Sequence, residues 1–297
     1  MNVLPMEKQV AVIDLLCEGM SIRAVSRSTG VHRDTIGRLL LTVGQGCAAL
    51  HDKMWFGLEV EQIAIDELWA FIGKKQRRLT PTDPPERGDC YTFLALDVLG
   101  KGILAYQTGK RDGDTARDFL TDLRARVVGA PILSSDAFPA YEALVAETFG
   151  NQVHYGQILK RYKGEPHKDA ARRYSPGIVV AVEREAKIGS PPEHLISTSH
   201  VERANLTVRM GQRRFTRLTN AYSKSVEHHR AAVSLFVAHY NFARPHTALG
   251  GITPAMERGL ARGIWPTSAL IEGAAIALAQ PLGRVARRFR VIDGGRD

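Results

Sequence analysis

Residues 62–72 read QIAIDELWAFI and residues 91–98 read YTFLALDV, and these two stretches decide the fold. The first tends to alternate between apolar and polar residues, as a β-strand does. The second is a nearly continuous apolar run, typical of a strand at the centre of a sheet. Gly100 and Gly102 predict a turn into a third strand at 103–108. The chain therefore predicts three strands in succession, with a long proline-containing polar loop between the first two.

Helical and strand patterns alternate after these strands. Apolar residues at helical spacing predict helices over 115–128 and 139–149, and short apolar runs predict strands at 131–134 and 151–154. Three antiparallel strands followed by alternating helices and strands is the order of the ribonuclease H-like fold. We expect an α/β domain of this class, with a mixed sheet and flanking helices, preceded by an all-α segment.

Three carboxylates fall at distinctive points of this order. Asp66 lies inside the first strand, Asp136 directly follows the fourth strand, and Glu202 lies near the start of a strongly patterned helix. The first and fourth strands are neighbours in such a sheet, so both aspartates can face one site, and the later helix can bring the glutamate across the sheet end. Converging carboxylates provide the hard oxygen ligands that Mg²⁺ or Mn²⁺ prefers, as in two-metal phosphoryl transfer.

Other acidic residues compete with these three. A structural salt bridge could also explain Asp66, and Asp97 in the second strand is its rival, although a place near the hairpin end favours a turn role. Glu67 should point to the opposite face of the sheet, because side chains alternate along a strand. The remaining candidates resemble a helix cap and a solvated helix face: Asp112, Asp114, Asp118 and Asp122.

The first 49 residues predict three short helices, over 5–18, 22–28 and 33–43. Ser21 can cap the second helix, and Gly30 supplies the turn into the third, which is the helix-turn-helix pattern. In a DNA-binding unit of this kind the second helix of the pair enters the major groove. The residues that would then contact DNA are His32, Arg33, Thr35 and Arg38. An ordinary three-helix bundle is the alternative interpretation.

The charge balance indicates a polyanionic partner. The chain has 297 residues and a net charge of +9, and 15 Lys and Arg against 7 Asp and Glu lie between Gln157 and Arg230. The three cysteines are far apart and form no CxxC pair, so neither disulfides nor a cysteine-rich zinc site is expected. Without a signal peptide or an apolar stretch long enough for a membrane span, we expect a cytoplasmic, nucleoid-associated protein.

The helix around Glu202 carries part of this basic charge. Glu202, Asn205, Arg209 and Arg213 recur at spacings that place them on one helical face. A carboxylate followed by arginines predicts a track for a metal site and a phosphate backbone, because the arginine fork grips phosphate oxygens in pairs. Arg203, Arg214 and Arg217 would widen this surface. The alternative is a solvated arginine-rich helix.

Four stretches together resemble bacterial insertion-sequence transposases of the DDE type, in particular the insertion sequence one family. They are IDELWAFIGKK, SSDAFPAY, STSHVERANLTVRMGQRRFTRLTNAYSKSVEHH and YNFARPHTAL…TPAM. The resemblance runs from about Gln62 to Leu260 and is less sharp over 157–196 and after Gly263. It implies a helix-turn-helix domain at 1–49, a linker at 50–61, a catalytic domain at 62–260 and a basic tail at 261–297 that includes Arg284–Arg290.

The resemblance also implies a function. Asp66, Asp136 and Glu202 would bind two divalent ions, Mg²⁺ or Mn²⁺. Water would attack the phosphodiester at the terminal inverted repeats of the element, and the freed 3′-hydroxyl would attack target DNA. A homo-oligomer on paired ends would be expected. Two alternatives remain: a DNA-binding regulator that has this scaffold without catalysis, and a nuclease or resolvase that cleaves without joining.

Overall fold

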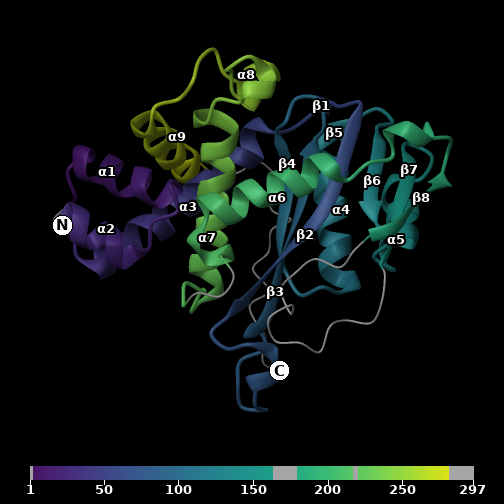
Figure 1. Cartoon of the computed structure of the whole chain (residues 1–297). Coiled ribbons are helices and arrows are strands. Elements are labelled where there is room, and N and C mark those ends of the chain that lie inside the picture. Colours follow the sequence, from purple (N-terminus) through teal and green to yellow (C-terminus); the bar gives the residue numbers. More distant parts are fainter. Residues whose placement is uncertain (1–2, 163–178, 217–219, 281–297) are drawn as a thin grey trace.

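A six-stranded mixed sheet forms the centre of the molecule in the computed structural model, which describes residues 3–162, 179–216 and 220–280 (Figure 1). The strand order is β4-β3-β2-β6-β7-β8. Strands β2, β3 and β4 pair antiparallel, β2–β6 and β6–β7 pair parallel, and β7–β8 pair antiparallel. The bounds are β2 Gln62–Ile72, β3 Gly88–Asp97, β4 Ile103–Gly109, β6 Ile132–Asp136, β7 His154–Tyr162 and β8 Val179–Ile188.

This topology confirms the predicted ribonuclease H-like fold, with two differences at the β7 edge. The predicted strand at 151–154 begins only at His154 and continues to Tyr162, and β8 follows as a strand that the sequence did not predict. The side chains of β8 are mostly exposed or half-buried. The strand therefore lacks the apolar run by which buried strands are found.

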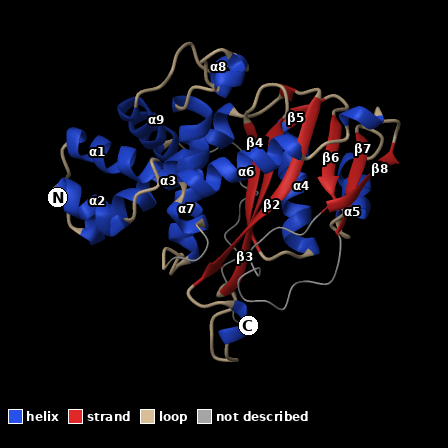
Figure 2. Cartoon of the chain, viewed as in Figure 1, coloured by secondary structure: helices blue, strands red, loops and turns tan. Residues whose placement is uncertain are grey.

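Side-chain alternation along β2 separates two cores. Ile63 and Ile65 pack with Phe119 on the face covered by α4 Gly113–Arg126 and α5 Tyr141–Phe149. Ala64 and Leu68 pack on the opposite face, which is covered by α6 Ser199–Gly211 and α7 Val226–Ala238. The sheet is thus enclosed between two helical layers (Figure 2). Side chains at odd and even positions of β2 therefore pack against different helical layers.

The N-terminal segment contains α1 Met6–Cys17, α2 Ile22–Thr29 and α3 Arg33–Met54. The Ser21 hydroxyl accepts a hydrogen bond from the Ala24 amide at 3.2 Å, and Gly30 ends α2 at a φ of 69°. Both features were predicted. However, α3 does not end at Val43 but runs to Met54, into the segment expected to be a linker.

Close helix packing explains the greater length of α3. A Cβ at Gly44 would lie 2.3 Å from the Ala231 carbonyl oxygen of α7, and a Cβ at Gly46 would lie 2.5 Å from that of Ala274 in α9. Tertiary contacts thus outweigh the low helix propensity of glycine. Helix α3 joins the N-terminal helices to the rest of the molecule (Figure 1).

The C-terminal part includes α8 Pro254–Glu257 and α9 Thr267–Ala279. Leu270, Ile271, Ala274 and Ala277 of α9 are buried, although this helix lies within the segment expected to be a basic tail. The predicted basic arm at Arg284–Arg290 lies outside the described residues. In the described part of the chain, no helix is long and apolar enough to cross a membrane.

Short elements complete the chain. The two-residue strands β1 Leu58–Glu59 and β5 Val127–Val128 pair in parallel. The short helical elements of the described residues are 3₁₀ turns over Gln76–Arg78, Glu193–Leu195, Arg213–Phe215 and Thr247–Leu249 and a π-helical turn over His239–Ala243.

Candidate active site

Asp66 and Asp136 converge because their strands are parallel neighbours. Asp66 lies in the middle of β2, and Asp136 is the last residue of β6, whose register pairs Ala64 with Ser134. Side-chain oxygens of Asp66, Glu67 and Asp136 all lie within 4.8 Å of one another. Three carboxylates at this distance form a compact set of hard oxygen donors.

Asp66 is fixed by two hydrogen bonds. Its Oδ1 accepts from the Glu67 amide at 2.8 Å, and its Oδ2 accepts from Asn205 Nδ2 of α6 at 2.7 Å. Burial raises the pKa of Asp66 to about 7, and the charges of Glu67, Asp136 and Glu202 add to this effect. A bound cation would offset that cost, so the site favours ionised Asp66 when a cation is present.

Glu202 approaches the same site from the first turn of α6. Its Oε1 accepts a hydrogen bond from Thr198 Oγ1 at 2.7 Å and pairs with Lys160 of β7. Its charge contributes to the raised pKa of Asp66. Glu202 is not one of the three residues of the compact group, so its place is at the rim of the carboxylate cluster.

Glu67 joins the cluster from the other face of the sheet. As alternation predicts, its side chain lies toward α5, where it accepts a hydrogen bond from Tyr141. Its oxygen nonetheless lies near Asp136, because β6 ends beside it. Burial raises the pKa of Glu67, and the charge of Asp136 raises it further.

Arg111 is a component of the site that the sequence did not indicate. Its Nε donates to Glu67 Oε2 at 3.0 Å, its Nη2 lies 3.5 Å from Asp136 Oδ2, and its guanidinium lies 4.3 Å from the centre of the Phe138 ring. Its position two residues after the end of β4 was the only available signal. Arg111 therefore links two carboxylates that approach from different strands.

Asp97, the rival of Asp66, has a structural role. Its Oδ1 accepts hydrogen bonds from the amides of Leu99 and Gly100, and its Oδ2 pairs with Arg258. The predicted turn role is confirmed. Asp112 likewise caps α4 by accepting from the Thr115 amide at 2.9 Å.

The donor set fits a divalent cation. Carboxylate oxygens are the ligands that Mg²⁺ and Mn²⁺ prefer. The Asn205 side chain is 1% exposed, and its Oδ1 is buried without a hydrogen-bond partner among the described residues. Because an unpaired buried acceptor costs free energy, a polar ligand at the site would also satisfy this atom.

The predicted DNA-binding residues do not all lie together in the structure. Arg33, Arg38, Arg213 and Arg214 line one groove between the N-terminal helices and the segment after α6. The prediction that Arg213 shares a helical face with Glu202 is wrong, because α6 ends at Gly211 and Arg213 begins a 3₁₀ turn.

The other predicted residues lie apart from that groove. Asn205 is buried against Asp66, whereas Arg203 is exposed and Arg209 half-buried on α6. His32 caps α3 by accepting from the Asp34 amide at 3.3 Å, and Thr35 accepts from Arg38 at 3.3 Å. Arg217 lies outside the described residues.

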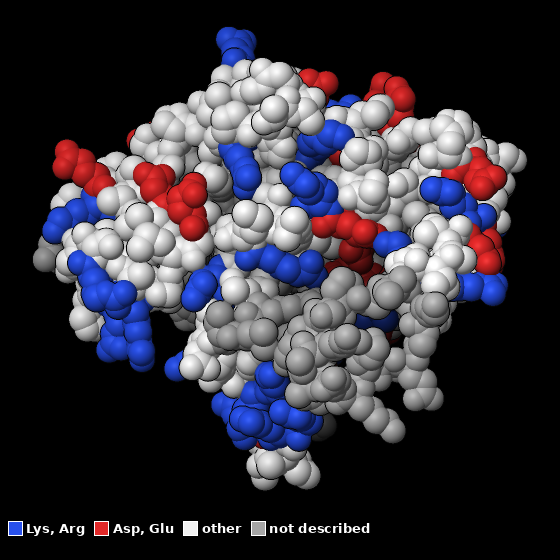
Figure 3. Space-filling model, viewed as in Figure 1, with Lys and Arg blue, Asp and Glu red and all other residues white. Residues whose placement is uncertain are grey.

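The surface distribution of charge agrees with this geometry. Figure 3 shows a recessed group of acidic side chains near the middle of one face, with Lys and Arg side chains on both sides of it. An acidic recess between basic surfaces suits a metal site that handles a polyanion.

Comparisons with known proteins give two partial sequence matches. The family model described as "Integrase core domain" matches residues 193–254, which include α6 with Glu202 and Asn205. The insertion element iso-IS1n protein InsB of Shigella dysenteriae is 25% identical over 178 residues, which cover 60% of this chain and 95% of that protein.

Solved transposase structures give only remote similarity. The piggyBac transposase synaptic complex with hairpin DNA is 12% identical, with a TM-score of 0.36, over 95% of this chain and 74% of that one. The pre-cleavage Mos1 transpososome is 10% identical, with a TM-score of 0.31, over 95% and 82%. Such TM-scores are too low to support the fold, which rests on the strand order.

The sheet topology, the carboxylate cluster and the match of residues 193–254 to the integrase core domain together indicate a transposase- or integrase-like DNA-processing protein. The similarity to the insertion element protein InsB is that of a distant homologue.

Proposed function

We propose that the protein cleaves DNA at the terminal inverted repeats of an insertion sequence and joins the freed ends to target DNA. Asp66, Asp136 and Glu202 are the proposed ligands of two divalent ions, Mg²⁺ or Mn²⁺. The convergence of Asp66 and Asp136 from neighbouring parallel strands supports this proposal most directly. When bound, the ions would activate the attacking oxygen and neutralise charge on the phosphate.

The surrounding side chains have defined tasks in this reaction. Asn205 orients Asp66 through its Nδ2 hydrogen bond. Lys160 pairs with Glu202, and Arg111 pairs with both Glu67 and Asp136. Both cations therefore lie where they can bind phosphate oxygens. Carboxylates and cations at one site can therefore hold both the ions and the DNA backbone.

DNA recognition in this proposal combines two surfaces. His32, Arg33, Thr35 and Arg38 at the start of α3 would contact the terminal repeats, as the second helix of a helix-turn-helix does. Arg203 and Arg209 on α6 would contact the backbone near the metal site, and Arg213, Arg214 and Arg217 are proposed contacts further along the chain. A homo-oligomer would hold two ends together.

Nicking of a labelled duplex that contains the element end tests catalysis. We expect Mg²⁺-dependent nicking by the wild-type protein and a loss of more than about 100-fold in Asp136→Asn, since even an outer partner of a metal ligand is worth about 10–100-fold. Asp118→Asn, on the exposed face of α4, is the matched control. Nicking by Asp136→Asn at the control rate would refute the assignment. Tight end binding without any wild-type nicking would instead indicate a regulator.

A further inference from the structure

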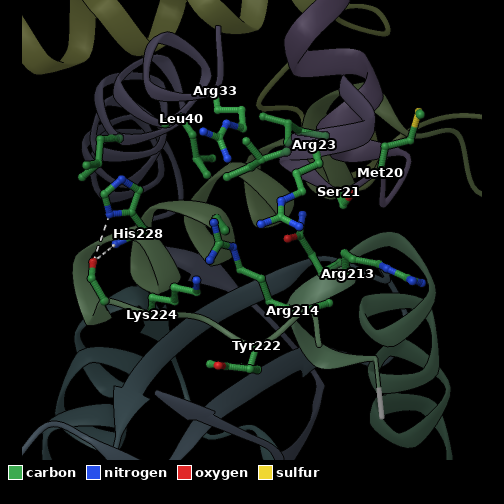
Figure 4. A pocket seen from close by; sticks show the side chains of 18 of the residues that line it. Met20, Ser21, Arg23, Arg33, Leu40, Arg213, Arg214, Tyr222, Lys224 and His228 are labelled. Carbon is green, nitrogen blue, oxygen red and sulfur yellow. Dashed lines mark hydrogen bonds between the residues drawn. The ribbon is translucent and has the colours of Figure 1, made fainter. Parts of the chain in front are cut away.

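A groove of about 1040 Å³ separates the N-terminal helices from the segment that follows α6. One wall comes from α2 and the start of α3, including Arg23 and Arg33, and the other includes Arg214 and Lys224 (Figure 4). The volume is at the top of the range of about 300–1,000 Å³ that is typical of ligand pockets. It is separate from the carboxylate cluster, none of whose residues line it.

The groove has a strong excess of positive charge. Six Lys and Arg side chains line it, against the single carboxylate of Asp34. Figure 4 shows Arg23, Arg33 and Arg214 pointing toward one another. Within the described ranges, none of the six forms a salt bridge with a carboxylate. Converging cations without acidic partners repel one another unless an anion lies between them.

Arg214 shows how far this charge is desolvated. Its Nη1 donates to Ser223 Oγ at 3.0 Å, and burial lowers its pKa to about 10. The side chain therefore remains cationic at neutral pH. Among the described residues, this half-buried guanidinium donates to a hydroxyl and pairs with no carboxylate, so a phosphate would compensate its partly desolvated charge.

Apolar residues line the same groove. Met20, Ile22 and Leu41 contribute to the N-terminal wall, and Tyr222 contributes from the other side. The Tyr222 ring stacks on Phe71, with ring centres 4.7 Å apart and planes inclined by 24°. Aromatic and apolar surfaces beside cations are the features that bind bases and phosphates of unpaired strands, whereas duplex DNA presents mainly its phosphates.

The two walls are held in a fixed relation. Besides the contact of Gly44 with α7, a Cβ at Gly19 would lie 2.8 Å from the Met210 carbonyl oxygen near the end of α6. The turn between α1 and α2 thus touches the helix whose first turn carries Glu202. The groove is therefore preformed and is connected to the candidate active site through α6.

We propose that this groove binds a single DNA strand, with phosphates at Arg23, Arg214 and Lys224 and a base near Tyr222. The inference deepens the proposed function, on which it rests, by assigning an unpaired strand of the DNA substrate to a second site. The helix-turn-helix and the segment after α6 then act on one strand together.

Fluorescence polarisation with a labelled oligothymidylate, in the absence of divalent ions, tests the proposal. We expect Arg23→Gln and Lys224→Gln each to weaken binding about tenfold, because each loses a charge-assisted hydrogen bond to a phosphate. Arg27→Gln is the matched control, because Arg27 is exposed one turn further along α2 and does not line the groove. Circular dichroism verifies that the variants fold.

A bromodeoxyuridine strand gives a second measurement, in which photo-crosslinking followed by mass spectrometry should map to Tyr222. Equal binding by Arg23→Gln and Arg27→Gln, no binding of the single strand by the wild-type protein, or equal weakening of duplex and single-strand binding by Arg23→Gln would overturn the proposal. Strand binding is measured without metal and does not depend on nicking. The binding test can therefore be interpreted even if the proposed catalysis fails.

Discussion

At the scale of residues, the candidate site combines groups that interact strongly with one another. Asp66 is half-buried beside two further carboxylates, and Arg111 and Lys160 supply the compensating charges. In this environment the protonation of one carboxyl depends on whether a cation is near. Stability and metal affinity should consequently change with pH in opposite directions.

Asp66 gives a testable pH dependence of stability. Its folded pKa of about 7 lies above the unfolded value of about 3.9. The folded state therefore binds the proton more tightly, and this contribution is complete below pH about 4 and lost as pH rises through about 7. Without metal, Asp66→Asn should be more stable than the wild type at pH 8 by about 1–3 kcal/mol. Urea denaturation should find no such difference at pH 4, and a constant difference would contradict the raised pKa.

Asn205 should affect catalysis through Asp66. Asn205→Ala removes the donor to Asp66 Oδ2, so we expect nicking to fall about 10–100-fold, as for other outer partners of metal ligands. Thr207→Ala, on the same helix but partly exposed, is the control. If metal affinity and nicking are unchanged in Asn205→Ala, the hydrogen bond has no positioning role.

At the scale of elements, α3 determines how the N-terminal helices are attached. Two of its three glycines, at positions 44 and 46, permit backbone contact with α7 and α9. The sequence predicted where α3 begins, because the Gly30 turn is a local signal. It could not predict where α3 ends, because that depends on contacts with Ala231 of α7 and Ala274 of α9, which are distant in sequence.

Gly44→Ala tests this packing. The new Cβ would lie 2.3 Å from the Ala231 carbonyl oxygen, so we expect a loss of about 1–3 kcal/mol from overpacking despite the better helix propensity of alanine. Gly37→Ala in the same helix meets only His228 Nε2 at 3.6 Å and should leave stability unchanged or slightly increased. Denaturation midpoints that do not separate the two variants would show that α3 is loosely packed.

The candidate site shows the same division between local and tertiary information. The strand positions of Asp66 and Asp136 were predictable, because alternating and apolar runs mark the strands. The contribution of Glu67 was not, since alternation correctly turns it to the other face but does not show that β6 ends beside it. The burial of Asn205 could not be predicted either, because helical spacing alone does not show which face of α6 packs against the sheet.

At the scale of the whole molecule, contacts distant in sequence close the fold around the sheet. Arg258, directly after α8, pairs with Asp97 at the end of β3 and donates to the Glu59 carbonyl at 3.0 Å. Asp97 is fully buried. The C-terminal segment thus stabilises the hairpin beside the sheet end.

Arg258→Ala should therefore be strongly destabilising. It leaves the Asp97 carboxylate buried without its cation, and breaking such a pair costs about 3–5 kcal/mol. Arg262→Ala, at an exposed position four residues further along the chain, serves as a comparison. Thermal unfolding should show a large decrease for Arg258→Ala alone, and equal decreases for the two variants would mean that the ion pair has no special importance.

The central claim is that Asp66, Asp136 and Glu202 support cleavage and joining of DNA. Strand transfer of the DNA that borders this gene into a plasmid target tests it most directly. With Mg²⁺, the wild-type protein and Asp118→Asn should produce joined ends with short target duplications, and Asp136→Asn should produce none. Joined products at the wild-type level from Asp136→Asn, or cleavage without any joining by the wild-type protein, would contradict the account.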